Sequence, residues 1–162
     1  MLPVCLVSAA ILTVIDQLIK HWAFTELQQI STIPIIQDVL HLTYCENRGA
    51  AFSILYGKTE LLMVMNSILL LFLLYLLLKK KFPHPLSMAS LSMIISGGIG
   101  NMIDRVIYEG NFVVDYIDFR LINFAIFNFA DICVVCGTIL LMIYFIFEEK
   151  LVGKASVEEN HD

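Results

Sequence analysis

Four long apolar stretches, separated by more polar segments, dominate the chain. They cover roughly residues 2–24, 61–78, 86–103 and 124–147, and each is close to the ~20 residues that a helix needs to cross a bilayer. The chain is 59% hydrophobic and 15% charged, with a mean hydropathy of +0.82. This balance excludes an ordinary soluble domain. The pattern predicts an all-α integral membrane protein with four transmembrane helices.

The same pattern predicts one compact domain over residues 1–150 and a flexible acidic tail over residues 151–162. Residues 1–4 carry no Lys or Arg, and no small-residue cleavage site follows the first apolar stretch. We therefore expect a retained helix there and not a cleaved signal peptide. The lysine triplet 79–81 is the densest basic cluster and directly follows the second stretch. Short basic loops stay cytoplasmic, which predicts cytoplasmic termini and two outer loops, about residues 25–60 and 104–123.

The first outer loop carries its own pattern. Residues 39–44 alternate between apolar and polar types, which predicts a short strand at the membrane surface, and residues 50–55 form a brief amphipathic segment. Cys45 is expected in a loop. Cys133 and Cys136 have a spacing known from redox and zinc sites, but no His or second cysteine pair completes a set of four ligands. We interpret them as packing residues and expect no metal site.

Ionisable residues within or beside a membrane span are costly, so their positions are informative. Asp16 and Lys20 are four residues apart at the expected outer end of the first span, on one helical face. They form either an ion pair that orients the helix or a contact to a substrate. The third span ends in SGGIGNMIDR (96–105), whose glycines favour close helix packing. Packing does not explain Asn101 and Arg105, which are again four residues apart.

Two further carboxylates flank the second outer loop. Asp115 lies in VVDYIDF (113–119), and Asp131 follows 16 residues later, about one turn into the fourth span. Two buried carboxylates that lie close together share one proton, because both cannot ionise cheaply in a low dielectric. Such a pair is able to activate water. A helix cap or a salt bridge would also place carboxylates at a membrane boundary, and Asn128 is suited to cap the fourth helix.

Taken together, these segments resemble the bacterial lipoprotein signal peptidases, also called signal peptidase II. The resemblance covers about residues 16–131 and rests on five motifs in order: DQLIK (16–20), NRGAAF (47–52), GGIGNMIDR (97–105), VVDYID (113–118) and FNFAD (127–131). Arg48 occupies a variable position of the second motif, and the Cys133/Cys136 pair is outside the pattern. The resemblance implies four helices with a small extracytoplasmic β-platform and a short surface helix.

The resemblance also implies an aspartyl endopeptidase. Such an enzyme removes the signal peptide of prolipoproteins just before a cysteine that carries a diacylglyceryl group. Asp115 and Asp131 match the catalytic pair, with Asp104 and Asp118 in supporting roles. The residues that match the surrounding polar groups are Asp16, Lys20, Asn47, Gly49, Asn101, Arg105 and Asn128.

The expected partners are lipid-modified prolipoproteins and membrane lipids, without cofactor, metal or nucleic acid. The expected location is the bacterial cytoplasmic (inner) membrane, with the active site on the extracytoplasmic side. Two other functions also place charges in spans. A small proton-coupled transporter is one, but no inverted repeat or broken-helix pair is visible in the sequence. A non-enzymatic scaffold, in which glycines and charges serve helix packing only, is the other.

Overall fold

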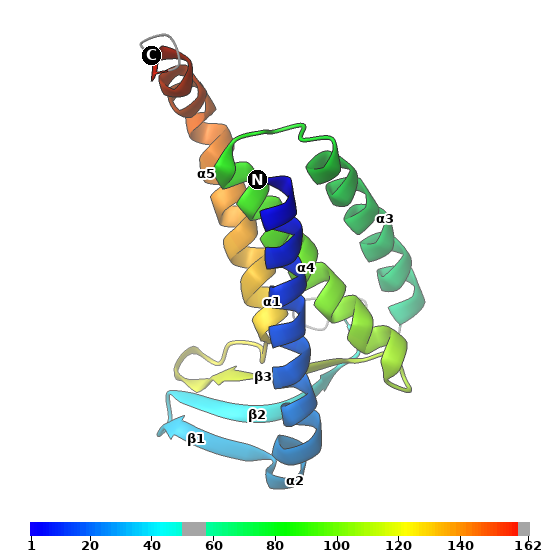
Figure 1. Ribbon diagram of the computed structural model, residues 1–162. Coiled ribbons are helices and arrows are strands. Elements are labelled where there is room, and N and C mark those ends of the chain that lie inside the picture. The colour runs from blue at the N-terminus through cyan, green and yellow to red at the C-terminus, as the bar shows by residue number, and fades with distance from the viewer. Residues whose placement is uncertain (50–57, 159–162) are drawn as a thin grey trace.

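Four long helices and a small sheet make up the part of the chain that the structure describes. The computed structural model describes residues 1–49 and 58–158. Four apolar helical segments within it are long enough to cross a membrane: Leu2–Ile30, Thr59–Leu78, Pro85–Ile107 and Phe129–Glu148. The prediction of four transmembrane helices is confirmed. Figure 1 shows these helices side by side, with the sheet at one end and both termini at the other.

The first helical segment is longer than predicted. Helix α1 spans Leu2–Trp22, a π-helical turn η1 spans Ala23–Leu27, and a short α2 spans Gln28–Ile30. The expected end at residue 24 was therefore wrong. The helix continues because Ala23 and Leu27 are fully buried against the sheet. Asp16 and Lys20 consequently lie within a continuous helix and not at its end.

The sheet has three antiparallel strands in the order β1-β2-β3. Their bounds are Thr32–Ile36 for β1, Leu40–Asn47 for β2 and Val113–Phe119 for β3. The predicted strand at residues 39–44 is confirmed, but Cys45 does not lie in a loop. Strand β2 continues past it, because Cys45 pairs with Asp115 of β3 and Asn47 pairs with Val113. Pairing between strands 70 residues apart gives no local signal.

Helix α4 (Pro85–Ile107) is the central helix, and α1, α3 (Thr59–Leu78) and α5 (Phe129–Glu158) pack against it. Small residues make this possible. A Cβ at Gly97 would overlap the backbone oxygen of Ala130 in α5, and a Cβ at Gly100 would overlap the Asp16 carboxylate of α1. The hydroxyl groups of the buried serines of α4 donate to backbone carbonyls a few residues earlier in the chain, as Ser92 Oγ does to the Met88 carbonyl at 2.9 Å. Close packing thus explains the glycines, as the sequence indicated.

The fourth spanning helix begins later than expected. Phe127 forms an isolated bridge with Ile117 of β3, and the backbone N–H groups of both residues donate to each other's carbonyls at 3.1 and 2.8 Å. Helix α5 therefore begins at Phe129, and Asp131 lies in its first turn. At the other end α5 runs to Glu158. Residues 159–162 of the expected tail and the amphipathic segment 50–55 lie outside the described residues.

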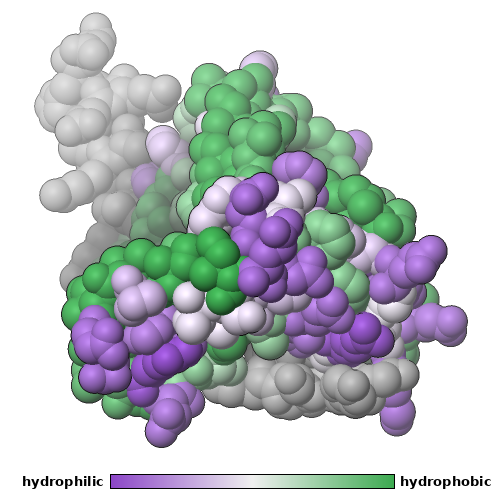
Figure 2. Space-filling view, turned by 90° about the horizontal axis from the view of Figure 1, so that it is seen from below, coloured by the Kyte–Doolittle hydropathy of each residue, from purple (hydrophilic) through white to green (hydrophobic). Residues whose placement is uncertain are grey.

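The sheet end of the molecule differs in polarity from the sides of the spanning helices. Figure 2 looks onto the sheet end and shows hydrophilic side chains gathered there between hydrophobic surfaces. The sides of the spanning helices expose apolar residues instead, such as Ile68 (64%) on α3 and Ile146 (73%) on α5. Exposed apolar helix sides above a polar end are the pattern of a protein whose helices lie in lipid and whose sheet lies at the membrane surface.

Candidate active site

The two candidate catalytic aspartates come from different elements and meet where the sheet joins the helices. Asp115 is the third residue of β3, and it is buried. Its Oδ2 accepts a hydrogen bond from Asn47 Nδ2 of β2 at 2.9 Å, and its Oδ1 accepts one from Asn128 Nδ2 at 2.6 Å. Both neighbours are carboxamides, so neither supplies a full positive charge.

Asp131 is held at the start of α5 by a reciprocal cap with Asn128. The backbone N–H of Asp131 donates to Asn128 Oδ1 at 2.9 Å, and the backbone N–H of Asn128 donates to Asp131 Oδ2 at 3.1 Å. The other oxygen, Oδ1, accepts from Asn101 Nδ2 of α4 at 2.8 Å. Asn128 thus caps the helix, as the sequence indicated, and the same side chain also binds Asp115. One asparagine connects the two aspartates.

Lys20 fixes the orientation of Asn101. Its Nζ donates to Asn101 Oδ1 at 2.8 Å, and Asn128 Nδ2 donates to the same oxygen at 3.1 Å. With its oxygen occupied by these two donors, the Asn101 amide must turn its nitrogen toward Asp131. Lys20 is 1% exposed and also pairs with Asp16 Oδ2 at 3.1 Å. The predicted ion pair therefore exists, and its lysine additionally contacts the site.

A second carboxylate shares Lys20 and joins the sheet to the helices. Asp104 Oδ2 lies 3.1 Å from Lys20 Nζ and accepts from the backbone N–H of Val114 in β3 at 3.0 Å. Its Oδ1 accepts from Gln17 Nε2 at 3.0 Å. The candidate list lacked Gln17. Its signal in the sequence was its place within the DQLIK motif, between Asp16 and Lys20.

Arg105 and Gly49 form the opposite side of the site. Arg105 Nη2 donates to the Gly49 carbonyl at 2.9 Å, and its Nη1 donates to the Asn101 carbonyl at 3.0 Å. The backbone N–H of Gly49 donates to Asn47 Oδ1 at 3.0 Å, which turns the Asn47 amide toward Asp115. All nine candidate site residues therefore lie in one hydrogen-bonded group. Arg105 Nε is buried and has no hydrogen-bond partner among the described residues.

Asp118 lies outside this group, although it is only three residues from Asp115. Its Oδ2 accepts from Thr43 Oγ1 at 2.7 Å and from Arg120 Nε at 2.8 Å, within the sheet. These bonds hold the pKa of Asp118 below its usual value, against the effect of desolvation. Burial, helped by the nearby charge of Asp131, instead raises the pKa of Asp115 to about 7. The pKa values of these two carboxylates on one strand thus differ because Asp115 is deeply buried near the charge of Asp131, whereas Asp118 is bonded directly to the Arg120 guanidinium.

A cleft opens beside Asp131. It has a volume of about 950 Å³ and lies between α3, α4 and α5, with Asn47, Asn101, Arg105 and Asp131 among its lining residues. Most of its remaining wall is apolar and comes from the spanning helices α3 and α5 and from the segment 124–127 that precedes α5. A long apolar segment placed along these helices would therefore end at the polar group that contains Asp131. Cys136 also lines this cleft, whereas Cys133 is buried.

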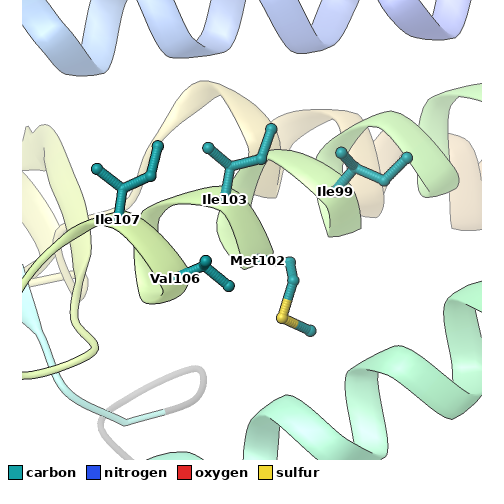
Figure 3. A pocket seen from close by; sticks show the side chains of 5 residues that line it. All are labelled: Ile99, Met102, Ile103, Val106 and Ile107. Atoms are coloured by element: carbon teal, nitrogen blue, oxygen red, sulfur yellow. The ribbon is translucent and has the colours of Figure 1, made fainter.

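A shallower hollow on α4 has no polar lining. It measures about 290 Å³ and is formed by five apolar residues that Figure 3 shows projecting from one helix: Ile99, Met102, Ile103, Val106 and Ile107. Val106 and Ile107 are 68% and 66% exposed. In a spanning helix such a surface is covered by lipid. Of the two hollows, only the larger cleft is lined by polar residues.

The fold and this cleft define an integral membrane protein with buried carboxylates where its apolar helices meet a small sheet. A sequence profile of the Signal peptidase (SPase) II family matches residues 8–147. The lipoprotein signal peptidase of Clostridioides difficile (strain 630) is 46% identical over 136 residues, 84% of this chain and 90% of that protein. The one from Streptococcus thermophilus (strain CNRZ 1066) is 39% identical over 146 residues, 89% and 94% of the two chains.

Solved structures agree with the sequence comparison. One bacterial membrane enzyme superposes with a TM-score of 0.82 at 29% identity, over 91% of this chain and 90% of that one. A second superposes with a TM-score of 0.78 at 30% identity, over 88% and 92%. The chain belongs to the signal peptidase II family, and the resemblance seen in the sequence is confirmed.

Proposed function

We propose that this chain is a membrane-embedded aspartic endopeptidase that cleaves the signal peptide of prolipoproteins, with Asp115 and Asp131 as the pair that activates water. The observation that carries the proposal is the shared partner Asn128, which binds the Asp115 carboxylate and caps helix α5, whose first turn holds Asp131. The family supports a signal peptidase. The apolar cleft suits a signal peptide, since these carry an apolar stretch of their own.

The chemistry follows from one proton shared by two carboxylates. The ionised partner takes a proton from water, and the resulting hydroxide attacks the carbonyl carbon of the scissile bond. The neutral partner donates its proton to the carbonyl oxygen, forming a neutral tetrahedral intermediate. When the C–N bond breaks, the proton that was taken from water passes to the leaving amine, and the hydroxyl proton returns to the other carboxylate. The pair ends in its starting state.

The substrate is proposed to carry a diacylglyceryl group on the cysteine that follows the scissile bond. Its lipid chains and its apolar signal segment would both lie in the bilayer beside the cleft walls of α3 and α5. The scissile bond would then arrive at the depth of Asp131. A transporter is less well supported, because the buried charges of residues 1–49 and 58–148 gather where the helices meet the sheet and do not extend along the bundle.

We further propose that the site faces the extracytoplasmic side of a bacterial cytoplasmic membrane. The lysine triplet 79–81 directly follows α3, at the end of the bundle that also holds both termini (Figure 1). The positive-inside rule places this end in the cytoplasm. The sheet and the aspartates, at the other end, then face outward.

Replacing either aspartate by asparagine tests the proposal. Asp115→Asn and Asp131→Asn keep the side-chain volume but remove an ionisable group, so cleavage of a diacylglyceryl-modified precursor by purified protein should fall at least about 10³-fold. Asp38→Asn makes the same change in the exposed turn between β1 and β2 and should leave cleavage unchanged. Full cleavage by either site variant would refute the assignment of the pair. An unmodified precursor serves as the control for lipid dependence.

A further inference from the structure

We propose that the loop between β3 and α5 inserts an apolar tip, Leu121 and Ile122, into the lipid leaflet beside the active-site cleft. The loop begins with the 3-10 turn η3 (Arg120–Ile122). Leu121 is 64% exposed and Ile122 is 65% exposed. From residue 121 to residue 130 the chain carries no charged side chain. This assignment does not depend on the catalytic roles proposed above.

The tip is held in place by the sheet. Arg120 turns its side chain away from the tip, with Nε 2.8 Å from Asp118 Oδ2 and Nη2 3.2 Å from Thr32 Oγ1. Its backbone N–H donates to the Val39 carbonyl at 2.9 Å. Asn123 then takes a left-handed conformation (φ 49°) and closes the turn onto the Arg120 carbonyl at 3.0 Å. The two exposed side chains are thus presented by a fixed turn whose cation points into the sheet.

The position of the loop indicates lipid as the partner. Figure 1 shows the segment between β3 and α5 on the side of the sheet that faces the helices, at the level where α5 begins. Phe124 of this loop lines the same cleft as Ile132 and Val135 of α5. Val135 is 56% exposed on a spanning helix, so lipid covers it. The apolar surface of the loop is therefore continuous with a surface that already lies in the bilayer.

The insertion would be shallow and would serve the cleft. Apolar side chains at a membrane surface reach about 5–10 Å into the boundary between headgroups and acyl chains. An anchor at this depth, next to Phe124 and Asp131 in the same cleft, would hold the site at the level where a lipidated cysteine lies. A second copy of the chain could also cover two apolar side chains, and the experiment below separates the two occupants.

Tryptophan quenching in lipid vesicles tests the insertion. Trp22 is the only tryptophan of the chain, so Trp22→Phe gives a silent background in which Ile122→Trp reports on the tip. Gln28→Trp is the matched control. Gln28 is exposed on α2, which lies beyond the sheet at the end of the molecule farthest from the two termini (Figure 1). Full-length protein is reconstituted in vesicles that contain brominated phosphatidylcholine. Each variant must keep the thermal unfolding midpoint of the Trp22→Phe parent in detergent, and Leu121→Trp replaces Ile122→Trp if that variant fails to fold.

The expected result is stronger bromine quenching of Ile122→Trp than of Gln28→Trp, by at least about twofold, and the reverse order with aqueous acrylamide. Bromine near the headgroup should quench Ile122→Trp more than bromine near the chain end, as shallow insertion requires. Equal acrylamide quenching of both variants would overturn the proposal. Protection of Ile122→Trp from both quenchers would also overturn it and would indicate a protein partner. Equal bromine quenching of both variants would overturn it as well, because residue 122 would then lie no deeper in lipid than residue 28.

Discussion

The carboxyl group of Asp115 is held between two carboxamides and away from any direct cationic partner. Burial and the charge of Asp131 raise its pKa to about 7, while the hydrogen bonds from Asn47 and Asn128 act in the opposite direction. Asp115 is therefore protonated below about pH 7 and ionised above it. A pair that needs one neutral member loses that member as the pH rises through this value.

We therefore predict that kcat/KM falls as the pH rises through about 7, measured with purified protein and lipidated precursor. Asn47→Ala removes a hydrogen bond that favours the ionised form, so the alkaline limb should move to higher pH even if the maximal rate falls. Asp38→Asn should leave the profile unchanged. An Asn47→Ala profile that moved to lower pH, or did not move, would contradict this account of the Asp115 carboxyl group.

At the residue scale, most of the site could be predicted from motifs and little from spacing. Spacing alone left two roles open for Asp131, a helix cap or a catalytic group. In the structure Asn128 caps the first turn of α5, which holds Asp131, and the same Asn128 side chain binds Asp115. A capping role and a catalytic role for this carboxylate are therefore compatible. Lys20 was expected to pair with Asp16, but its contact to Asn101 crosses between α1 and α4. A contact between residues 81 positions apart cannot be predicted from a local sequence pattern.

At the scale of the elements, the glycines of α4 determine how closely its neighbours approach. A Cβ at Gly97 would overlap the Ala130 carbonyl oxygen, which belongs to the α5 backbone. A Cβ at Gly98 would instead meet the end of the Leu70 side chain at 2.6 Å. A leucine end can rotate away, whereas a helix backbone next to Asp131 cannot shift without moving the site. The two adjacent positions should therefore respond differently to the same added methyl group.

We predict that Gly97→Ala destabilises the protein by about 1–3 kcal/mol, the usual cost of overpacking, and that Gly98→Ala costs less. Thermal unfolding of both variants in the same detergent compares them directly. Gly97→Ala should also lower cleavage of lipidated precursor, because α5 carries Asp131 in its first turn. Equal stability of the two variants would show that α4 and α5 have room to separate at this point.

The sequence predicted which helices form better than it predicted where each helix begins and ends. Runs of apolar residues located all four helices, because lipid demands about 20 of them in a row. The ends depend on contacts that apolar runs do not contain. The first helix extends through Ala23 and Leu27 because the sheet buries both residues. The last helix begins only after the bridge between Phe127 and Ile117. Strand β3 was missed as a strand because its partners come from β2, far away in the chain.

At the scale of the whole molecule, the proposed orientation has a direct test. In a variant whose native cysteines are replaced, Asp38→Cys lies in the exposed β1–β2 turn and Lys80→Cys in the turn after α3. We predict that a membrane-impermeant maleimide labels Asp38→Cys on intact spheroplasts and labels Lys80→Cys only after the membrane is broken. The reverse labelling would invert the topology and place the aspartates in the cytoplasm.

The cleft beside Asp131 is walled by spanning helices, which changes how a substrate reaches it. A molecule that arrives along α3 and α5 diffuses in the plane of the membrane, so its encounter rate follows its number per unit of membrane area. The concentration in the surrounding solution then has no direct bearing on the rate. Empty lipid added to a fixed amount of enzyme and precursor would slow turnover by surface dilution, and saturation would be expressed as a mole fraction of lipid.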